Sequence, residues 1–201
     1  MSSESRPTSK AAQSEATRAK LLSAARELFG ARGFASVGTE EVVRAAGVTR
    51  GALYHQFADK RELFEAVFEQ LEQEIIEVAA GRMAEHPDDM LAAFRAACRG
   101  WIEVCLRPEV ERIVLLDAPA VLGWEAWREI GERYGLGAVI ASLEYGMESG
   151  AFTRQPVRPL AHVIVGALDE LALYVVRAED RQAAVAEAET IMDRMIDSLA
   201  T

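Results

Sequence analysis

The sequence of 201 residues has only two cysteines, too few for a disulfide framework. Cys98 and Cys105 fall on one expected helix, where seven positions separate them by about 10 Å along the axis, too far for a bridge. We therefore expect a reducing, cytoplasmic compartment. No apolar run reaches the roughly 18 residues of a membrane span, and the polar start MSSESRPTSK lacks the pattern of a signal peptide. We expect no membrane partner.

Catalytic and metal-binding patterns are also missing. None of the three histidines, His55, His86 and His162, has a partner at ligand spacing, and Cys-x-x-Cys does not occur. The segment Gly-Val-Thr-Arg-Gly at 47–51 lacks the Gly-Lys-Thr/Ser of a phosphate-binding loop. No nucleophile stands beside a base. We predict no metal, no cofactor and no enzyme activity.

The charge is unevenly divided along the chain. The net charge is −10, yet residues 1–61 hold ten Lys and Arg against six Asp and Glu, giving +4. Residues 62–201 hold twelve against 26, giving −14. A basic head on an acidic body favours orientation of the head towards DNA. An acidic body that only keeps the protein soluble is the alternative.

The composition and the apolar periodicity favour helices throughout. Half of the residues are hydrophobic, whereas only 7% are aromatic. We predict an all-α fold of about nine helices, with a three-helix head before a larger helical body. The helices are expected over 14–32, 40–46, 50–56, 60–84, 90–107, 109–117, 124–149, 160–178 and 181–199.

Three expected units follow from these helices. Residues 1–12, polar and rich in serine, are predicted to be a disordered arm. Residues 13–60 are predicted to form the head and residues 61–201 the body. We expect Ala118-Pro119 to interrupt the sixth helix, and the seventh to bend near Gly135 to Gly137.

The head contains the signals of a helix-turn-helix. Thr39 is expected to cap the first short helix, and Gly47 ends it where a left-handed residue is needed. Thr49 is expected to cap the second short helix. Asp59 is expected to cap the long helix that follows, with Glu62 completing a capping box. Two capped helices around a glycine turn are typical of DNA-binding proteins, and the second one enters the major groove.

The second short helix carries chemistry suited to DNA. Arg50 and His55 can donate to phosphates or base edges, and the Tyr54 hydroxyl can reach a phosphate. Gly51 and Ala52 are small enough for close approach. The expected DNA-binding residues are Thr39, Thr49, Arg50, Gly51, Ala52, Tyr54, His55 and Lys60.

The head resembles the N-terminal domain of the TetR family of transcriptional regulators. The resemblance covers about a quarter of the chain, and beyond it the match is only in length and helical character. The matching positions are Leu21-Leu22, Ala24-Ala25, Leu28-Phe29, Gly33, Thr39, Val43, Ala46-Gly47-Val48-Thr49, Gly51, Leu53-Tyr54, Phe57, Lys60 and Leu63.

The resemblance implies that residues 13–60 are the DNA-binding domain and that residues 61–201 are the ligand-binding and dimerisation domain, with a homodimer and a small-molecule pocket. The last two helices would pair with their copies in a second subunit, so the double-stranded operator would be palindromic. The expected interface residues are Leu168, Leu171, Val175, Met192, Met195, Ile196 and Leu199. The pocket candidates are Phe94, Cys98, Trp101, Cys105, Asp117, Trp124, Trp127, Tyr145 and Asp169, with ordinary core packing as the alternative for each.

These features favour a repressor that a small-molecule effector releases from its operator. Two other classes stay open. The chain can be a helical interaction module in which the helix-turn-helix is only a scaffold, or a helical enzyme. Salt-dependent binding to duplex DNA separates the first class from the second, and turnover of a bound ligand would indicate the third.

Overall fold

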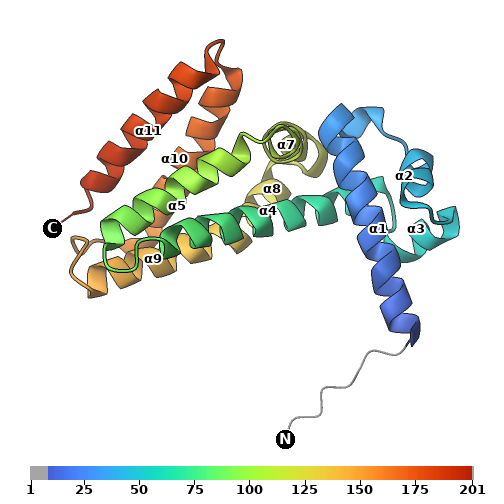
Figure 1. Cartoon of the computed structure of the whole chain (residues 1–201), viewed down its shortest axis with the longest axis horizontal. Helices are drawn as coiled ribbons and strands as arrows, with labels where there is room; N and C mark the ends of the chain where they lie inside the picture. The colour runs from blue at the N-terminus through green and yellow to red at the C-terminus, as the bar shows by residue number, and fades with distance from the viewer. Residues whose placement is uncertain (1–8, 201) are drawn as a thin grey trace, which may run out of the picture.

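A computed structural model describes residues 9–200 of the chain. In this range the chain forms helical rods joined by short loops, and extended pairing is limited to one isolated antiparallel bridge between Phe152 and Ala200. The rods make a small head at one end and a larger body at the other (Figure 1). The predicted all-α class is confirmed.

The head holds the two short helices and the glycine turn that the sequence predicts. Its elements are α1 (Ser9–Arg32), the 3-10 turn η1 (Phe34–Ser36), α2 (Thr39–Ala46) and α3 (Arg50–Gln56). Gly47 ends α2 in the left-handed conformation, with φ 64° and ψ 34°. The Thr49 hydroxyl oxygen accepts a hydrogen bond from the Ala52 N–H at 3.1 Å and so caps α3.

Two boundaries of the head differ from the prediction. Helix α1 begins at Ser9, so residues 9–12 of the expected disordered arm are helical, while residues 1–8 of that arm lie outside the described residues. The N-cap of α2 is Gly38, and Thr39 is the first helical residue. Val37 is buried, and the extended backbone that follows it at Gly38 starts the helix one position earlier than the side-chain signal indicates.

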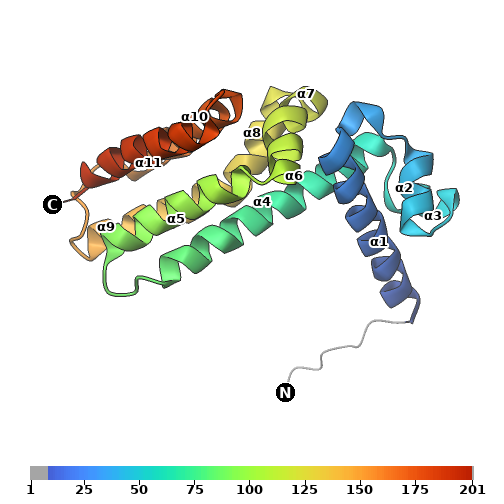
Figure 2. The ribbon, with the colours of Figure 1, turned by 45° about the horizontal axis from the view of Figure 1, so that its top comes forward.

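Helix α4 (Lys60–Ala84) runs from the head into the body, where it packs antiparallel against α5 (Met90–Cys105), as Figures 1 and 2 show. The Asp59 carboxylate accepts from the Glu62 N–H at 2.8 Å, as expected for a cap. The Glu62 carboxylate accepts in turn from the Ala58 N–H, one residue before the position that a capping box uses. One helix is therefore shared by head and body.

Two rods of the body contain π-helical turns. The first consists of α6 (Pro108–Val110), π-helical η2 (Glu111–Asp117) and α7 (Ala118–Leu122). The second consists of α8 (Trp124–Gly131), π-helical η3 (Glu132–Leu136) and α9 (Gly137–Glu148). The predicted interruption at Ala118-Pro119 was wrong, because Pro119 stands in the first turn of α7, directly after η2 has already changed the regular hydrogen bonding. The expected bend near Gly135 coincides with η3.

The last two helices, α10 (Val157–Arg177) and α11 (Arg181–Asp197), lie side by side on one flank of the body (Figure 1). By length and composition α10 suffices to cross a membrane, so the expectation that no such stretch exists was wrong. Asp169 and Glu170 interrupt the apolar run without making the helix polar. A core helix of a soluble protein passes the same test, and α10 buries Ala161, Ile164, Leu168, Ala172 and Val175 inside this chain.

Each part of the core contains one group of aromatic rings in contact. In the head, the rings of Phe29, Phe34 and Phe64 have centroids 5.1–5.7 Å apart and join α1, η1 and α4. In the body, Phe94 of α5 meets Phe152 at 5.7 Å, beside α9, α10 and α11. The first group of rings packs the head on the start of α4, and the second packs α5 against the far end of the body.

We expect Gly146→Ala to destabilise the body. A Cβ atom at Gly146 would lie 2.1 Å from Cδ2 of the buried Phe152 ring, so the ring and α9 must separate. Overpacking of this kind costs about 1–3 kcal/mol of unfolding free energy. Urea unfolding measures the loss.

Gly81→Ala is the matched control. It lies in the interior of α4, and no atom stands within 4 Å of its added Cβ. The control is expected to gain about 0.5–1 kcal/mol, because alanine favours helix. Equal midpoints for the two variants would refute the close packing at Gly146.

Candidate DNA-binding head and effector cavity

Helix α3 presents a polar face to solvent and one apolar anchor to the core. Leu53 is fully buried, which fixes how α3 is rotated on the head. Arg50, Tyr54 and His55 are exposed as a result, and Gly51 adds no side chain beside them. This face has hydrogen-bond donors, and its small residues let the helix backbone come close to the bases of a major groove.

Two contacts orient the Arg50 side chain at the start of α3. Its guanidinium lies 5.6 Å from the centroid of the Tyr54 ring and 3.3 Å from a carboxylate oxygen of Glu40. Both partners are largely exposed, so these contacts orient the side chain more than they stabilise the fold. Thr39 is half-buried at the start of α2, and Ala52 is half-buried on α3.

Lys60 is occupied inside the head. Its Nζ donates to the carbonyl oxygens of Phe34 at 2.8 Å and Val37 at 2.9 Å, and lies 3.9 Å from the centroid of the Phe34 ring. Burial lowers the pKa of the ammonium. The geometry gives no support to the phosphate-binding role predicted for Lys60, because its donors hold η1 against α4 instead.

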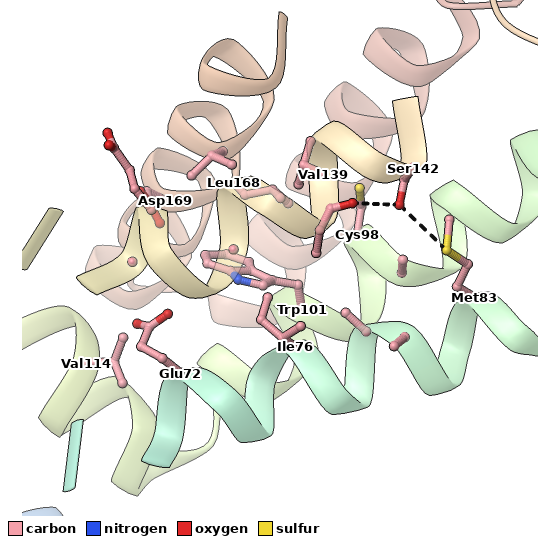
Figure 3. A pocket seen from close by; sticks show the side chains of 18 of the residues that line it. Glu72, Ile76, Met83, Cys98, Trp101, Val114, Val139, Ser142, Leu168 and Asp169 are labelled. Carbon is pink, nitrogen blue, oxygen red and sulfur yellow. Dashed lines mark hydrogen bonds between the residues drawn. The ribbon is translucent and has the colours of Figure 1, made fainter. Parts of the chain in front are cut away.

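A cavity of about 140 Å³ lies in the body among α4, α5, α8, η3, α9 and α10, with η2 closing one side (Figure 3). Apolar cavities of about this size hold molecules such as benzene. The wall is mainly apolar and includes Ile76, Ala79, Ala80, Met83, Phe94, Ala97, Cys98, Trp101, Val114, Trp127, Ala138, Val139, Val165 and Leu168. Polar side chains are few: Glu72, Arg128, Glu132, Ser142 and Asp169.

Five of the nine predicted pocket residues line this cavity, namely Phe94, Cys98, Trp101, Trp127 and Asp169. Four do not. Cys105 is fully buried beneath the wall, and Asp117 lies at the junction with the head. The side chains of Trp124 and Tyr145 are 61% and 62% exposed, because each occupies the solvent side of its helix. Phe94, Cys98 and Trp101 of α5 and Trp127 of α8 thus share the cavity side, whereas Trp124 at the start of α8 and Tyr145 on α9 face solvent.

Two carboxyl groups stand at one end of the cavity. Glu72 of α4 is 8% exposed, and Asp169 approaches from α10 (Figure 3). Burial, together with the charge of Asp169, raises the pKa of Glu72 to about 8. Burial raises the pKa of Asp169 to about 6, against the opposing effect of the Arg128 guanidinium. Near neutral pH the two groups therefore hold about one proton between them.

Glu72 was missed by the sequence reasoning, although a signal existed. Ile76, Ala79, Ala80 and Met83 form a second apolar strip on α4, beside the strip that packs on the head and α5. Glu72 falls on the same strip, four positions before Ile76. An acidic residue in line with an apolar strip marks a buried carboxyl group.

The body is hydrogen-bonded to the head through η2 and the end of α7. The Asp117 carboxylate accepts from the Phe34 N–H at 2.7 Å and lies 3.5 Å from the Arg112 guanidinium. Arg61, in the first turn of α4, donates to the carbonyl oxygens of Val121 and Leu122 at 3.3 and 3.1 Å. These bonds satisfy backbone groups of both parts, so the two units cannot rotate freely.

The same π-helical segment reaches the cavity. Val114 of η2 lines the wall, and its carbonyl oxygen accepts from Trp127 Nε1 at 3.2 Å. Asp117 follows three residues later. The contact with Trp127 and the bond that holds Phe34 are therefore less than one helical turn apart on the same segment.

The predicted dimer residues are mostly used within the chain. Five of them, on α10, on α11 and just after α11, are buried against other parts of the same chain: Leu168, Val175, Met192, Ile196 and Leu199. This corrects their assignment, because helical periodicity identifies an apolar face without showing what covers it. The outer face of the pair carries exposed Val163, Tyr174 and Ile191, with half-buried Leu171 and Met195 beside them.

Comparison with known proteins identifies both parts of the chain. Residues 21–67 match the family described as bacterial regulatory proteins of the tetR family. Residues 91–199 match the family described as the Tetracyclin repressor-like C-terminal domain. The first match covers the helix-turn-helix, and the second covers the cavity helices from α5 onward together with α10 and α11.

Individual relatives agree with these families. The transcriptional regulator AcrR of Shigella flexneri is 35% identical over 103 residues, 51% of this chain and 48% of its own. The regulator CymR of Pseudomonas putida is 40% identical over 74 residues, 36% of each chain. The chain thus spans about half or less of the length of these curated relatives.

A solved structure matches almost the whole chain. The TetR-family transcriptional regulator of Pectobacterium atrosepticum is 33% identical, with a TM-score of 0.82 over 97% of this chain and 98% of its own. RolR, solved with the ligand resorcinol, shares the fold at 22% identity and a TM-score of 0.69, over 94% of this chain and 95% of its own. From its sequence, its fold and its match over both parts, this chain belongs to the TetR family of transcriptional regulators.

Proposed function

We propose that the protein represses transcription by binding a palindromic operator through α3, and that a small molecule in the cavity releases it. One observation carries the proposal: the polar face of α3 and the cavity are joined by α4 and η2, with Phe34 bonded to Asp117. The proposed DNA-binding unit covers residues 13–60 and the body covers residues 61–201. Its relatives are regulators rather than enzymes, so catalysis forms no part of the proposal.

The DNA contacts are assigned to exposed groups of the head. Arg50, Tyr54 and His55 would reach base edges or phosphates, and Gly51 would allow close approach. The N–H groups at the start of α3 would meet phosphate, with Thr49 fixing the turn. The body's acidic charge would keep the cavity side away from the duplex.

A homodimer would supply two such heads. We assign the interface to the outer face of α10 and α11, where Val163, Tyr174 and Ile191 are exposed. Burying this face would also remove the apolar length of α10 from water, consistent with a soluble, cytoplasmic protein. A two-fold axis through this face would place the recognition helices on half-sites about one helical turn apart, roughly 34–36 Å.

Effector release would follow from competition between two arrangements of the head. The operator-binding arrangement keeps the Phe34–Asp117 bond, with Trp127 bonded to Val114. A ligand that fits better when Trp127 or Val114 moves would favour a different head spacing. Its difference in affinity between the two arrangements sets the size of the response.

Arg50→Ala and Tyr54→Ala are expected to weaken operator binding by about 1–3 kcal/mol each, roughly 5- to 150-fold. The operator is first selected from a random duplex library. Affinity is then measured by fluorescence anisotropy between 50 and 200 mM salt. Wild-type affinity should fall steeply with salt because phosphate contacts release counterions.

Arg154→Ala removes an exposed arginine from the body and serves as the control. Thermal unfolding of all three variants should match the wild type within about 0.5 kcal/mol, as for other surface substitutions. Failure of the selection to enrich any duplex would count against the DNA-binding proposal and favour an interaction module.

Ile191→Arg is expected to dissociate the dimer. Ile191 is 46% exposed on the proposed interface, and two-fold symmetry would bury two unpaired guanidinium groups there. The dimer dissociation constant should rise by about 100-fold or more, measured by sedimentation velocity. Leu116→Arg, the same change at a 41% exposed residue of η2, should stay dimeric. A monomeric wild type at micromolar concentration would overturn the interface.

A further inference from the structure

The polar end of the cavity has an excess of negative groups. Glu72, Glu132 and Asp169 face it, whereas Arg128 is the one basic side chain among the described residues of the lining. The Arg128 guanidinium is already bonded to Glu132 at 3.1 Å. Glu72, which is buried, and Asp169, which is partly buried, thus remain as two carboxyl groups without a basic side chain of their own, and Arg128 acts only on Asp169.

We propose that the Glu72–Asp169 pair makes this cavity selective for a small organic cation with an apolar body, such as an aryl or alkyl ammonium ion. This inference rests on the proposed function, because it specifies the effector of the same cavity. The cationic group would lie between α4 and α10, and the apolar body would extend along the wall towards Met83 and Val139.

The apolar wall suits such a cation. Trp101 lies in the cavity between Glu72 and Val139 in Figure 3, and Trp127 is a second indole ring in the lining. Indole rings attract cations that have lost their water, especially quaternary ammonium groups, which need no hydrogen-bond acceptor. A cavity that combines carboxylates with indole rings therefore compensates an organic cation for its lost hydration.

Other ligand charges fit poorly. An organic anion would lie against Glu72 and Asp169, and like charges in a buried site repel strongly. A neutral ligand would leave the pair as it is and gain only from the apolar wall. The pair therefore discriminates by charge, whereas the wall discriminates by size.

Binding of the cation would release a proton. Burial and the charge of Asp169 act on Glu72, whereas burial, Arg128 and Glu170 act on Asp169. Glu132, which pairs with His162, lines the same cavity, and Cys105 of α5 lies within the influence of both carboxyl groups. The pKa of Glu72 is thereby about 8 and that of Asp169 about 6. A bound cation favours both ionised forms, so the affinity should rise as the pH increases from 6 to 8 and level off above that.

The test uses two probes of the same shape. Phenyltrimethylammonium and tert-butylbenzene differ in one central atom and one positive charge, and benzenesulfonate serves as the anion. Binding to the full chain is followed by quenching of tryptophan fluorescence. We expect the cation to bind at least about tenfold more tightly than the neutral probe, and the anion more weakly than either.

Two substitutions on α4 form a matched pair. Glu72→Gln keeps the shape of the side chain but removes its charge, so at pH 8 it should reduce the advantage of the cation. It should also abolish the rise in cation affinity above pH 7, which depends on Glu72, while leaving tert-butylbenzene affinity unchanged. Glu77→Gln makes the same change at an exposed position one and a half turns away and should alter neither. Equal binding of the two isosteric probes to the wild type, or an unchanged cation preference in Glu72→Gln, would overturn the inference.

Stability provides an independent measurement. The pKa of Glu72 lies near 8 in the folded protein against a model-compound value of 4.5, so unfolding releases a proton between these values. Stability should therefore fall as the pH rises through this range, less so in Glu72→Gln. If Glu72→Gln does not fold, the two isosteric probes and the pH series on the wild type decide the matter alone.

Operator release is measured separately with the same probes. If the cation binds selectively without releasing DNA, the cation inference stands and the effector proposal fails. If the neutral probe binds as well as the cation and releases DNA, the effector proposal stands and the cation inference fails.

Calorimetry in two buffers of different ionisation enthalpy should show release of up to about one proton per cation at pH 7.

Discussion

The rigidity of one uninterrupted α-helix sets the geometry of this protein. Helix α4 is capped by Asp59 at the head and ends 25 residues later beside the cavity. Phe64 on its second turn belongs to the aromatic cluster of the head, and Glu72, two turns further along, faces the cavity. Their separation along the axis, about 12 Å, is fixed by the helical rise. The head therefore cannot change its tilt without moving the wall of the cavity.

The sequence predicts the head well because its signals are local. Gly47, Thr49 and Asp59 act on backbone groups within four residues of themselves, and Leu53 and Phe57 are buried by simple periodicity. Thr39 shows the limit of such reasoning, because a tertiary contact at Val37 shifts the helix start. Lys60 shows another limit: a basic residue in a first turn resembles a phosphate ligand until η1 folds over it.

The cavity is less predictable because it depends on the rotation of separate helices. Phe94, Cys98 and Trp101 share one face of α5, and knowledge of the period suffices to group them. Trp124 could not be placed in this way, because it starts α8 directly after the break at Gly123, nor could Tyr145, because π-helical η3 changes the phase of the rod before it. The interface residues failed for a related reason: an apolar face on α11 fits a neighbouring helix of the same chain as well as it fits a second subunit.

The π-helical turns of η2 have an implication for how sequences of this kind can diverge. A π turn holds one more residue than the α turn it replaces, so it behaves like a single-residue insertion accommodated within the rod. Removing one residue between Glu111 and Asp117 would restore regular winding and leave the flanking helices nearly in phase, but residues inside the segment would move to other faces of the rod. Val114 and Asp117 would then no longer serve cavity and head together. Related chains that differ in length must therefore keep the number of residues in this short segment if ligand binding and DNA binding are to remain linked. The spacing matters more here than the identity of the side chains.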